Sequence, residues 1–102
     1  MARYANLDLY SQEEKDFWDR LCTCAGKTYK TFRGLEYTFV VKGNELFFTR
    51  KRKSITRATI MQAYRKTKER MKKDMPISGP KKLDVFGASY LYPIFKNLGL
   101  FE

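Results

Sequence analysis

The residues with the clearest capacity for chemistry are the lysines and arginines between positions 50 and 73. Eleven of them share this segment of 24 residues with one acid, Glu69, and they account for the whole net charge of +10, because cations and anions balance in the rest of the chain. Lysine and arginine are the side chains that neutralise phosphate groups. The segment therefore predicts a surface for a polyanion, which is nucleic acid, the acidic face of a protein or an anionic membrane.

The basic run stands directly before a predicted helix, in the stretch FFTRKRKSITRATI at residues 47–60. Cations are disfavoured there because the N-terminus of a helix already carries partial positive charge. A bound phosphate or carboxylate would relieve this repulsion and would meet the backbone N–H groups of the first turn. We therefore expect an anion at this position; without one, Arg57 and the connector before it form only a solvated face.

The phosphate-binding hypothesis assigns roles to individual side chains. Tyr64, with Tyr90 and Tyr92, would stack on exposed bases if these rings lie beside the cations, as in proteins that bind single strands. Aromatic residues at helical spacing are also typical of a core, and a lysine-rich face is also typical of a solvated surface, so both interpretations stay open at this stage. The predicted nucleic-acid-binding residues are Arg50, Lys51, Arg52, Lys53, Arg57, Tyr64, Arg65, Lys68 and Lys72.

The sequence carries no catalytic or metal-binding motif. It has no histidine, no glycine-rich phosphate loop and no nucleophile elbow, so we expect no enzyme activity and no cofactor. Cys22 and Cys24 are the only cysteines, and carboxylates alone would have to complete a four-ligand zinc site, so we expect no metal. A disulfide across one intervening residue would be strained, and two free thiols that are buried or half-buried fit a reducing compartment.

Length and hydropathy limit the class of protein. No apolar run approaches the roughly 20 residues that span a bilayer, and MARYANLDLY at the N-terminus lacks the apolar core of a signal peptide. A chain of 102 residues holds one domain with one modest core, which an aromatic content of 16% is ample to build. We expect a single cytoplasmic domain over residues 1–102 with no membrane contact, and its oligomeric state stays open.

Two motifs predict the structure of the N-terminal half. Ser11 and Glu14 form a capping box, so a helix begins there, buries one face and ends before Gly26. Residues 36–50 predict a β-hairpin around the turn Gly43-Asn44. Residues 29–33 are a candidate third strand. The predicted cross-strand pairs are Val41 with Leu46, Phe39 with Phe48, Tyr37 with Arg50, Lys42 with Glu45, Val40 with Phe47 and Thr38 with Thr49.

A long basic helix should follow, capped by Thr56 or Ser54 and stabilised by Ile55 packing on Ile60. Its apolar positions recur at helical period and predict a narrow core stripe. A neighbouring stripe and the positions further round should be exposed and almost wholly cationic. The core stripe comprises Ile60, Ala63, Tyr64, Thr67 and Met71; the exposed stripe comprises Arg57, Met61, Arg65, Lys68 and Lys72; further round lie Lys66, Arg70 and Lys73.

The C-terminal segment predicts a helical turn at residues 80–85, a break at Gly87, and a helix that is capped near Ser89 and ends near Leu98. Together with the basic helix this outlines a helix-turn-helix over residues 56–100. Pro93 and the scarcity of Arg, Lys, Asn and Gln on the last helix make a poor base-reading face, so a core role for this helix is the preferred interpretation.

Two stretches, GNELFFTRKRKSITRATI and SGPKKLDVFGASYLYPIFKNLGL, together resemble short uncharacterised proteins of Gram-positive bacteria that are often found near mobile elements. The resemblance covers residues 36–100 and implies a bacterial cytoplasmic protein with no assigned activity.

The sequence thus predicts an α+β fold: an N-terminal helix, a β-hairpin, a long basic helix and a C-terminal helix around one aromatic core. The expected function is a small nucleic-acid-binding module, for DNA or RNA, that contacts phosphates through residues 50–73. The alternative is a protein-interaction module that docks an acidic partner, and the third interpretation is an enzyme whose site uses no histidine.

Overall fold

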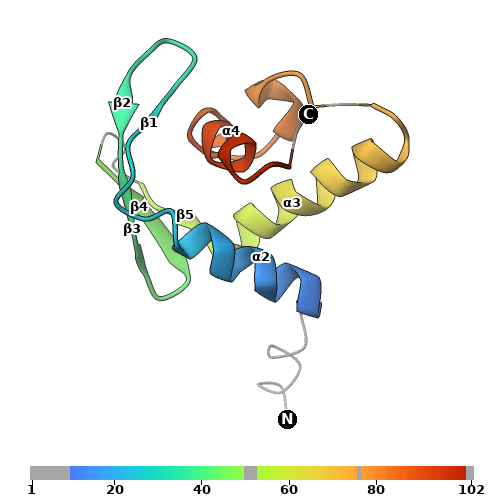
Figure 1. Ribbon diagram of the computed structural model, residues 1–102, viewed down its shortest axis with the longest axis horizontal. Coiled ribbons are helices and arrows are strands. Elements are labelled where there is room, and N and C mark those ends of the chain that lie inside the picture. The colour runs from blue at the N-terminus through green and yellow to red at the C-terminus, as the bar shows by residue number, and fades with distance from the viewer. Residues whose placement is uncertain (1–9, 50–52, 76, 101–102) are drawn as a thin grey trace.

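The computed structural model describes residues 10–49, 53–75 and 77–100. Helices and a small amount of antiparallel sheet are mixed, which confirms the predicted α+β class. Figure 1 shows the strands on one side of the molecule and the helices on the other, with α2 and α3 below α4 in this view. In chain order the elements are α2 (Gln12–Cys22), β1 (Tyr29–Lys30), β2 (Glu36–Tyr37), β3 (Phe39–Lys42), β4 (Glu45–Phe48), β5 (Ile55–Thr56), α3 (Arg57–Lys72), the 3-10 helix η1 (Pro80–Leu83) and α4 (Ala88–Asn97).

Helix α2 begins with the predicted capping box. The Ser11 hydroxyl accepts a hydrogen bond from the Glu14 amide at 3.1 Å, and the Glu14 carboxylate accepts one from the Ser11 amide at 3.0 Å. Two otherwise unpaired backbone donors are satisfied in this way. The helix buries one face, formed by Phe17, Trp18 and Leu21.

The hairpin of β3 and β4 has the predicted register, with Phe39 opposite Phe48, Val40 opposite Phe47, Val41 opposite Leu46 and Lys42 opposite Glu45. Gly43 takes a positive φ of 61° in the turn, which favours glycine because it has no Cβ. Thr38 and Thr49 also lie opposite each other, with the Thr49 amide donating to the Thr38 carbonyl at 3.0 Å. The predicted partner of Tyr37, Arg50, lies outside the described residues.

The third strand of the hairpin sheet is β5, which pairs with β4 and gives the order β3-β4-β5. The candidate third strand, residues 29–33, does not take this position. Tyr29 and Lys30 do form a strand, but it pairs with β2 in a separate two-stranded sheet. The cause is local: Gly34 has a φ of 83°, and its amide donates to the Thr31 carbonyl, so the chain reverses at once.

Helix α3 starts at its predicted cap, where the Thr56 hydroxyl accepts a hydrogen bond from the Thr59 amide at 3.3 Å. Its buried face is broader than the predicted stripe, because Met61, expected among the exposed residues, is fully buried beside Ile60. Met71, expected in the core, is exposed. Figure 1 shows why: the C-terminal turns of α3 run beyond the elements that cover its first half.

Helix α4 belongs to the core, as its apolar sequence predicts. It starts at Ala88 after Gly87, which has a positive φ of 77° and provides no side-chain cap, so the predicted cap at Ser89 is wrong. Pro93 lies inside the helix. Four of its residues are buried, namely Leu91, Tyr92, Ile94 and Phe95.

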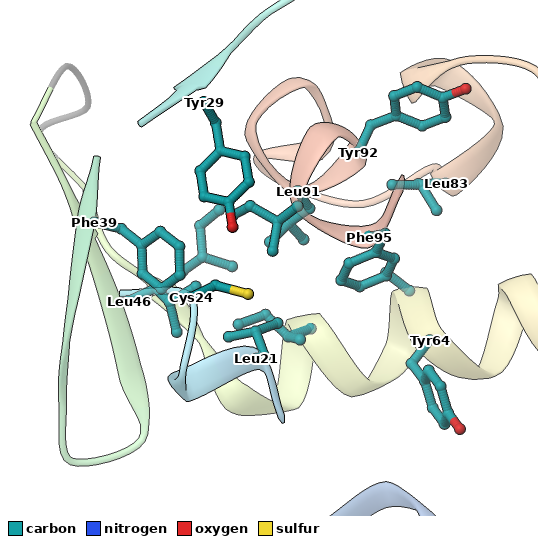
Figure 2. Packing of buried hydrophobic residues seen from close by; sticks show 14 of the residues in the cluster. Leu21, Cys24, Tyr29, Phe39, Leu46, Tyr64, Leu83, Leu91, Tyr92 and Phe95 are labelled. Atoms are coloured by element: carbon teal, nitrogen blue, oxygen red, sulfur yellow. The ribbon is translucent and has the colours of Figure 1, made fainter. Parts of the chain in front are cut away.

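One buried cluster joins helices and sheets. Phe17 stacks on Tyr64 with ring centroids 4.2 Å apart and meets Phe95 edge to face at 5.3 Å, so α2, α3 and α4 share an aromatic contact. Figure 2 shows Leu91 and Phe95 between α4 and α3, with Phe39 reaching the same cluster from the sheet. Cys24 is buried and Cys22 is partly buried, and both are free, as predicted. The aromatic core of the sequence prediction is confirmed.

Candidate anion-binding surface

The predicted cationic stripe of α3 faces α2. Arg65 holds the Glu14 carboxylate with two hydrogen bonds, from Nε at 2.6 Å and from Nη2 at 3.1 Å. Lys68 Nζ lies 2.8 Å from Oε2 of Glu13. Two of the residues predicted to bind phosphate therefore bind carboxylates of the acidic helix. The Arg65–Glu14 pair is separated by 51 residues, so helical periodicity gives no sign of it.

These ion pairs shift the ionisation of their members. The hydrogen bond from Arg65 lowers the pKa of Glu14, and the hydrogen bond from Lys68 lowers the pKa of Glu13. The same bonds raise the pKa values of Arg65 and Lys68. Only 12% of the Glu14 side chain is exposed. All four groups are charged near neutral pH, and the two ion pairs connect α2 to α3.

Arg57 resolves the conflict at the start of α3 in another way. Its guanidinium carbon lies 4.6 Å from the centre of the Tyr10 ring and 5.0 Å from that of Trp18. The negative faces of aromatic rings attract a cation. The backbone amide of Arg57 donates to the Asn44 carbonyl at 2.7 Å, and the Thr59 amide donates to Thr56. Two amides of the first turn, which an external anion was expected to meet, are thus used within the protein.

The other predicted site residues are dispersed. Tyr64 is buried with Phe17 stacked on its ring, and Figure 2 shows its side chain leaving α3 on the side away from Phe95. A base therefore has no open ring to stack on at Tyr64. Tyr92 is buried as well. Lys53 and Lys72 are exposed, whereas Arg50, Lys51 and Arg52 lie outside the described residues.

A different set of cations converges between the C-terminal half of α3 and η1. Lys66 and Arg70 of α3 and Lys73, which caps the C-terminus of this helix, follow one another at i, i+4 and i+7 and so share a face. Across from them stand Lys81 and Lys82 of η1. These five residues line a hollow of about 320 Å³ together with Glu69, Met75 and Asp84. We call this hollow the basic groove.

The local sequence explains why η1 stands opposite α3. Asp74 takes a positive φ of 57° just after the helix, and the Met75 amide donates back to the Arg70 carbonyl at 2.8 Å, so the chain turns away from α3. Pro80 opens η1, where its missing N–H costs nothing. Leu83 is fully buried and anchors η1 to the core, while Lys81 and Lys82 are exposed.

The lining of the basic groove carries more positive than negative charge. Lys66 Nζ lies 3.2 Å from Oδ2 of Asp84, which is itself well exposed. Glu69 is the second carboxylate on the lining, so among the residues that the structure describes five cations stand against two anions. In the low-dielectric surroundings of a hollow, such an imbalance attracts counter-ions more strongly than dispersed surface charges do.

Sequence reasoning missed Lys81 and Lys82, because the charges outside residues 50–73 sum to zero and hide a local pair. The available signal was the Lys-Lys doublet directly after Gly79-Pro80. Lys66, Arg70 and Lys73 belong to the predicted phosphate-binding segment 50–73 but are not among its individually named binding residues, because the helical period places them further round the helix.

The proposed helix-turn-helix outline has little support in the geometry. Residues 73–87, including η1, separate α3 from α4, whereas the two helices of such a unit are joined by a turn of roughly three or four residues. On α4, Asn97 accepts a hydrogen bond from the Tyr29 hydroxyl at 3.2 Å. One of the few polar side chains of this helix is thereby engaged within the protein.

No protein-family model matches the chain, and no curated protein or solved structure is significantly similar to it. Within residues 10–49, 53–75 and 77–100, none of the helices has the length and apolar character that crossing a bilayer requires. The same described residues hold no group of three or more cysteine, aspartate and glutamate side chains placed to bind a metal.

Proposed function

We propose that this protein is a cytoplasmic nucleic-acid-binding module whose basic groove contacts phosphates of the DNA or RNA backbone. The observation that carries the proposal is the convergence of Lys66, Arg70 and Lys73 with Lys81 and Lys82 on one hollow. Phosphate contacts of this kind fix a protein on the backbone without reading the base sequence. Two free cysteines accord with a reducing compartment.

The cationic surface continues beyond the groove. Lys73 and Glu69 line both the groove and a second hollow, which Lys72 also borders. Lys72, one of the residues that the sequence predicts to bind phosphate, therefore lies next to the basic groove. Arg65 and Lys68 border that second hollow too, but in the proposal their role is to hold α2 through Glu14 and Glu13.

A second candidate function is the docking of an acidic protein segment in the same groove. The observation in its favour is internal: two cations of α3 already bind two glutamates of α2. An acidic segment from another protein would repeat this chemistry with Arg70, Lys73 and the lysines of η1.

Salt titration of oligonucleotide binding tests the first function. We expect labelled DNA or RNA to bind with a slope of log affinity against log salt concentration of about −2 to −4, since each phosphate neutralised contributes roughly −0.7 to −0.9 and the groove holds a handful of cations. A slope near zero, or no binding at about 50 mM salt, would refute the proposal. Capture of an acidic protein from nuclease-treated extract, with no oligonucleotide binding, would favour the second candidate.

A further inference from the structure

An aromatic ring stands exposed beside the basic groove. Phe32 lies in the loop between β1 and β2 and is 69% exposed. It borders a hollow of about 470 Å³ whose exposed surface consists mainly of carbon atoms, and we call it the apolar hollow. The other residues that line it are Ser78, Gly79, Pro80, Lys81, Lys82 and Ser89. A phenylalanine this open to water gives up the stabilisation that burial would bring, and a ligand that covers the ring would restore it.

Several contacts hold the ring in place. The Phe32 ring meets Tyr92 edge to face, with centroids 5.3 Å apart, and it lies against the backbone of Gly79, where an added Cβ would come within 3.7 Å of its Cε2 atom. The loop itself is closed by hydrogen bonds from the Thr31 amide to the Leu35 carbonyl at 3.0 Å and from the Gly34 amide to the Thr31 carbonyl at 2.9 Å. The ring is thus positioned before any ligand arrives.

The apolar hollow and the basic groove adjoin each other, because Lys81 and Lys82 line both. Lys81 also borders a third hollow with Phe86, which is 50% exposed. Two exposed aromatic rings therefore adjoin the same lysine. Alternation of aromatic faces with cations matches a chain in which flat bases alternate with phosphates.

We infer that the ligand of this surface is single-stranded nucleic acid, with an unpaired base packed on Phe32 and the adjoining phosphates on Lys81, Lys82 and the basic groove. This inference rests on the proposed function and narrows its substrate class. In a duplex both faces of each base are covered by its neighbours, whereas a single strand can turn a base outward onto an aromatic side chain. Lys81 and Lys82, which line the apolar hollow, favour an anionic chain over an uncharged apolar segment.

The test compares a single-stranded oligonucleotide with a duplex of the same length and with an abasic strand, which keeps the phosphates but has no bases. We expect the single strand to bind most tightly. Phe32→Ala should weaken single-strand binding roughly 5- to 150-fold, the range for loss of a stacked base, and should leave duplex and abasic binding unchanged. Phe47→Ala is the matched control, since Phe47 is also exposed, at 39%, on the hairpin, and it should have no effect.

Phe32→Trp provides a second measurement that does not depend on the alanine variant. We expect it to keep single-strand affinity, and a stacked base should quench the fluorescence of the new indole. Equal affinity for single strand and duplex would overturn the inference. So would an unchanged affinity of Phe32→Ala together with no quenching in Phe32→Trp. In either case a steep salt dependence of binding would still support the proposed function. Absence of binding to all three oligonucleotides would overturn both.

Discussion

Removal of three groove lysines is the most direct perturbation of the proposed surface. Lys73, Lys81 and Lys82 come from both walls of the basic groove and are all exposed. Replacing each with glutamine removes the charge and keeps most of the side-chain length. Because surface substitutions away from buried contacts usually change stability by less than about 0.5 kcal/mol, we expect the triple variant to fold as the parent does.

The size of the effect follows from counterion release. Each phosphate contact on a single strand contributes about 0.7 to the slope of log affinity against log salt concentration. Loss of three contacts should therefore reduce the slope by about 2. At roughly 0.1 M salt each contact is worth about 0.7 logarithmic units, so the affinity should fall roughly 100-fold.

Fluorescence anisotropy with a labelled oligonucleotide at several salt concentrations measures both quantities. The matched control replaces Lys27, Lys30 and Lys42 with glutamine. These lysines are exposed on the side of the strands, and their replacement removes the same net charge. We expect the control to change the slope by much less than 1. Equal losses for the two triple variants would refute the assignment, because they would show a response to net charge and not to the groove.

Four further outcomes concern the elements that support the site. A double-mutant cycle with Glu14→Gln and Arg65→Gln should give a coupling free energy of about 0.5–1 kcal/mol in urea unfolding, since the pair is bidentate but Arg65 is half exposed; additive losses would show that the pair does not fasten α2. Arg65→Gln should also leave oligonucleotide affinity nearly unchanged compared with the triple lysine variant, and a comparable loss would return Arg65 to the binding surface. The pKa of Glu14 is lowered from its ordinary value of 4.5, so its contribution to stability is fully present above about pH 4.5 and is lost as pH falls through the lowered value. The free energy of unfolding should therefore fall in that acidic range, and it should fall less steeply in Arg65→Gln. Parallel curves of unfolding free energy against pH for the parent and the variant would contradict this. Thr56→Ala should lower the free energy of unfolding by about 1 kcal/mol because the first turn of α3 loses its cap, while Thr56→Ser should retain it; equal thermal melting temperatures for the two variants would argue against the cap.

The sequence by itself determined the features that depend on neighbours along the chain. The capping box of Ser11 and Glu14 and the cap at Thr56 act across three residues, and the hairpin register follows from a two-residue turn at Gly43-Asn44. Such contacts are fixed by local backbone geometry, so residue types at short spacing are enough to predict them. The segment that carries the net charge, residues 50–73, can likewise be identified from the sequence.

The tertiary structure decided which cations remain available. Glu13 and Glu14 of α2 occupy Lys68 and Arg65, while η1 places Lys81 and Lys82 opposite Lys73. These pairings join residues far apart in the chain, and no periodicity within one helix specifies which neighbour its faces will meet. The predicted phosphate-binding stripe therefore lies against an acidic helix. The candidate site lies on the adjacent face of α3, because the packing of Leu83 into the core fixes where the second basic wall stands.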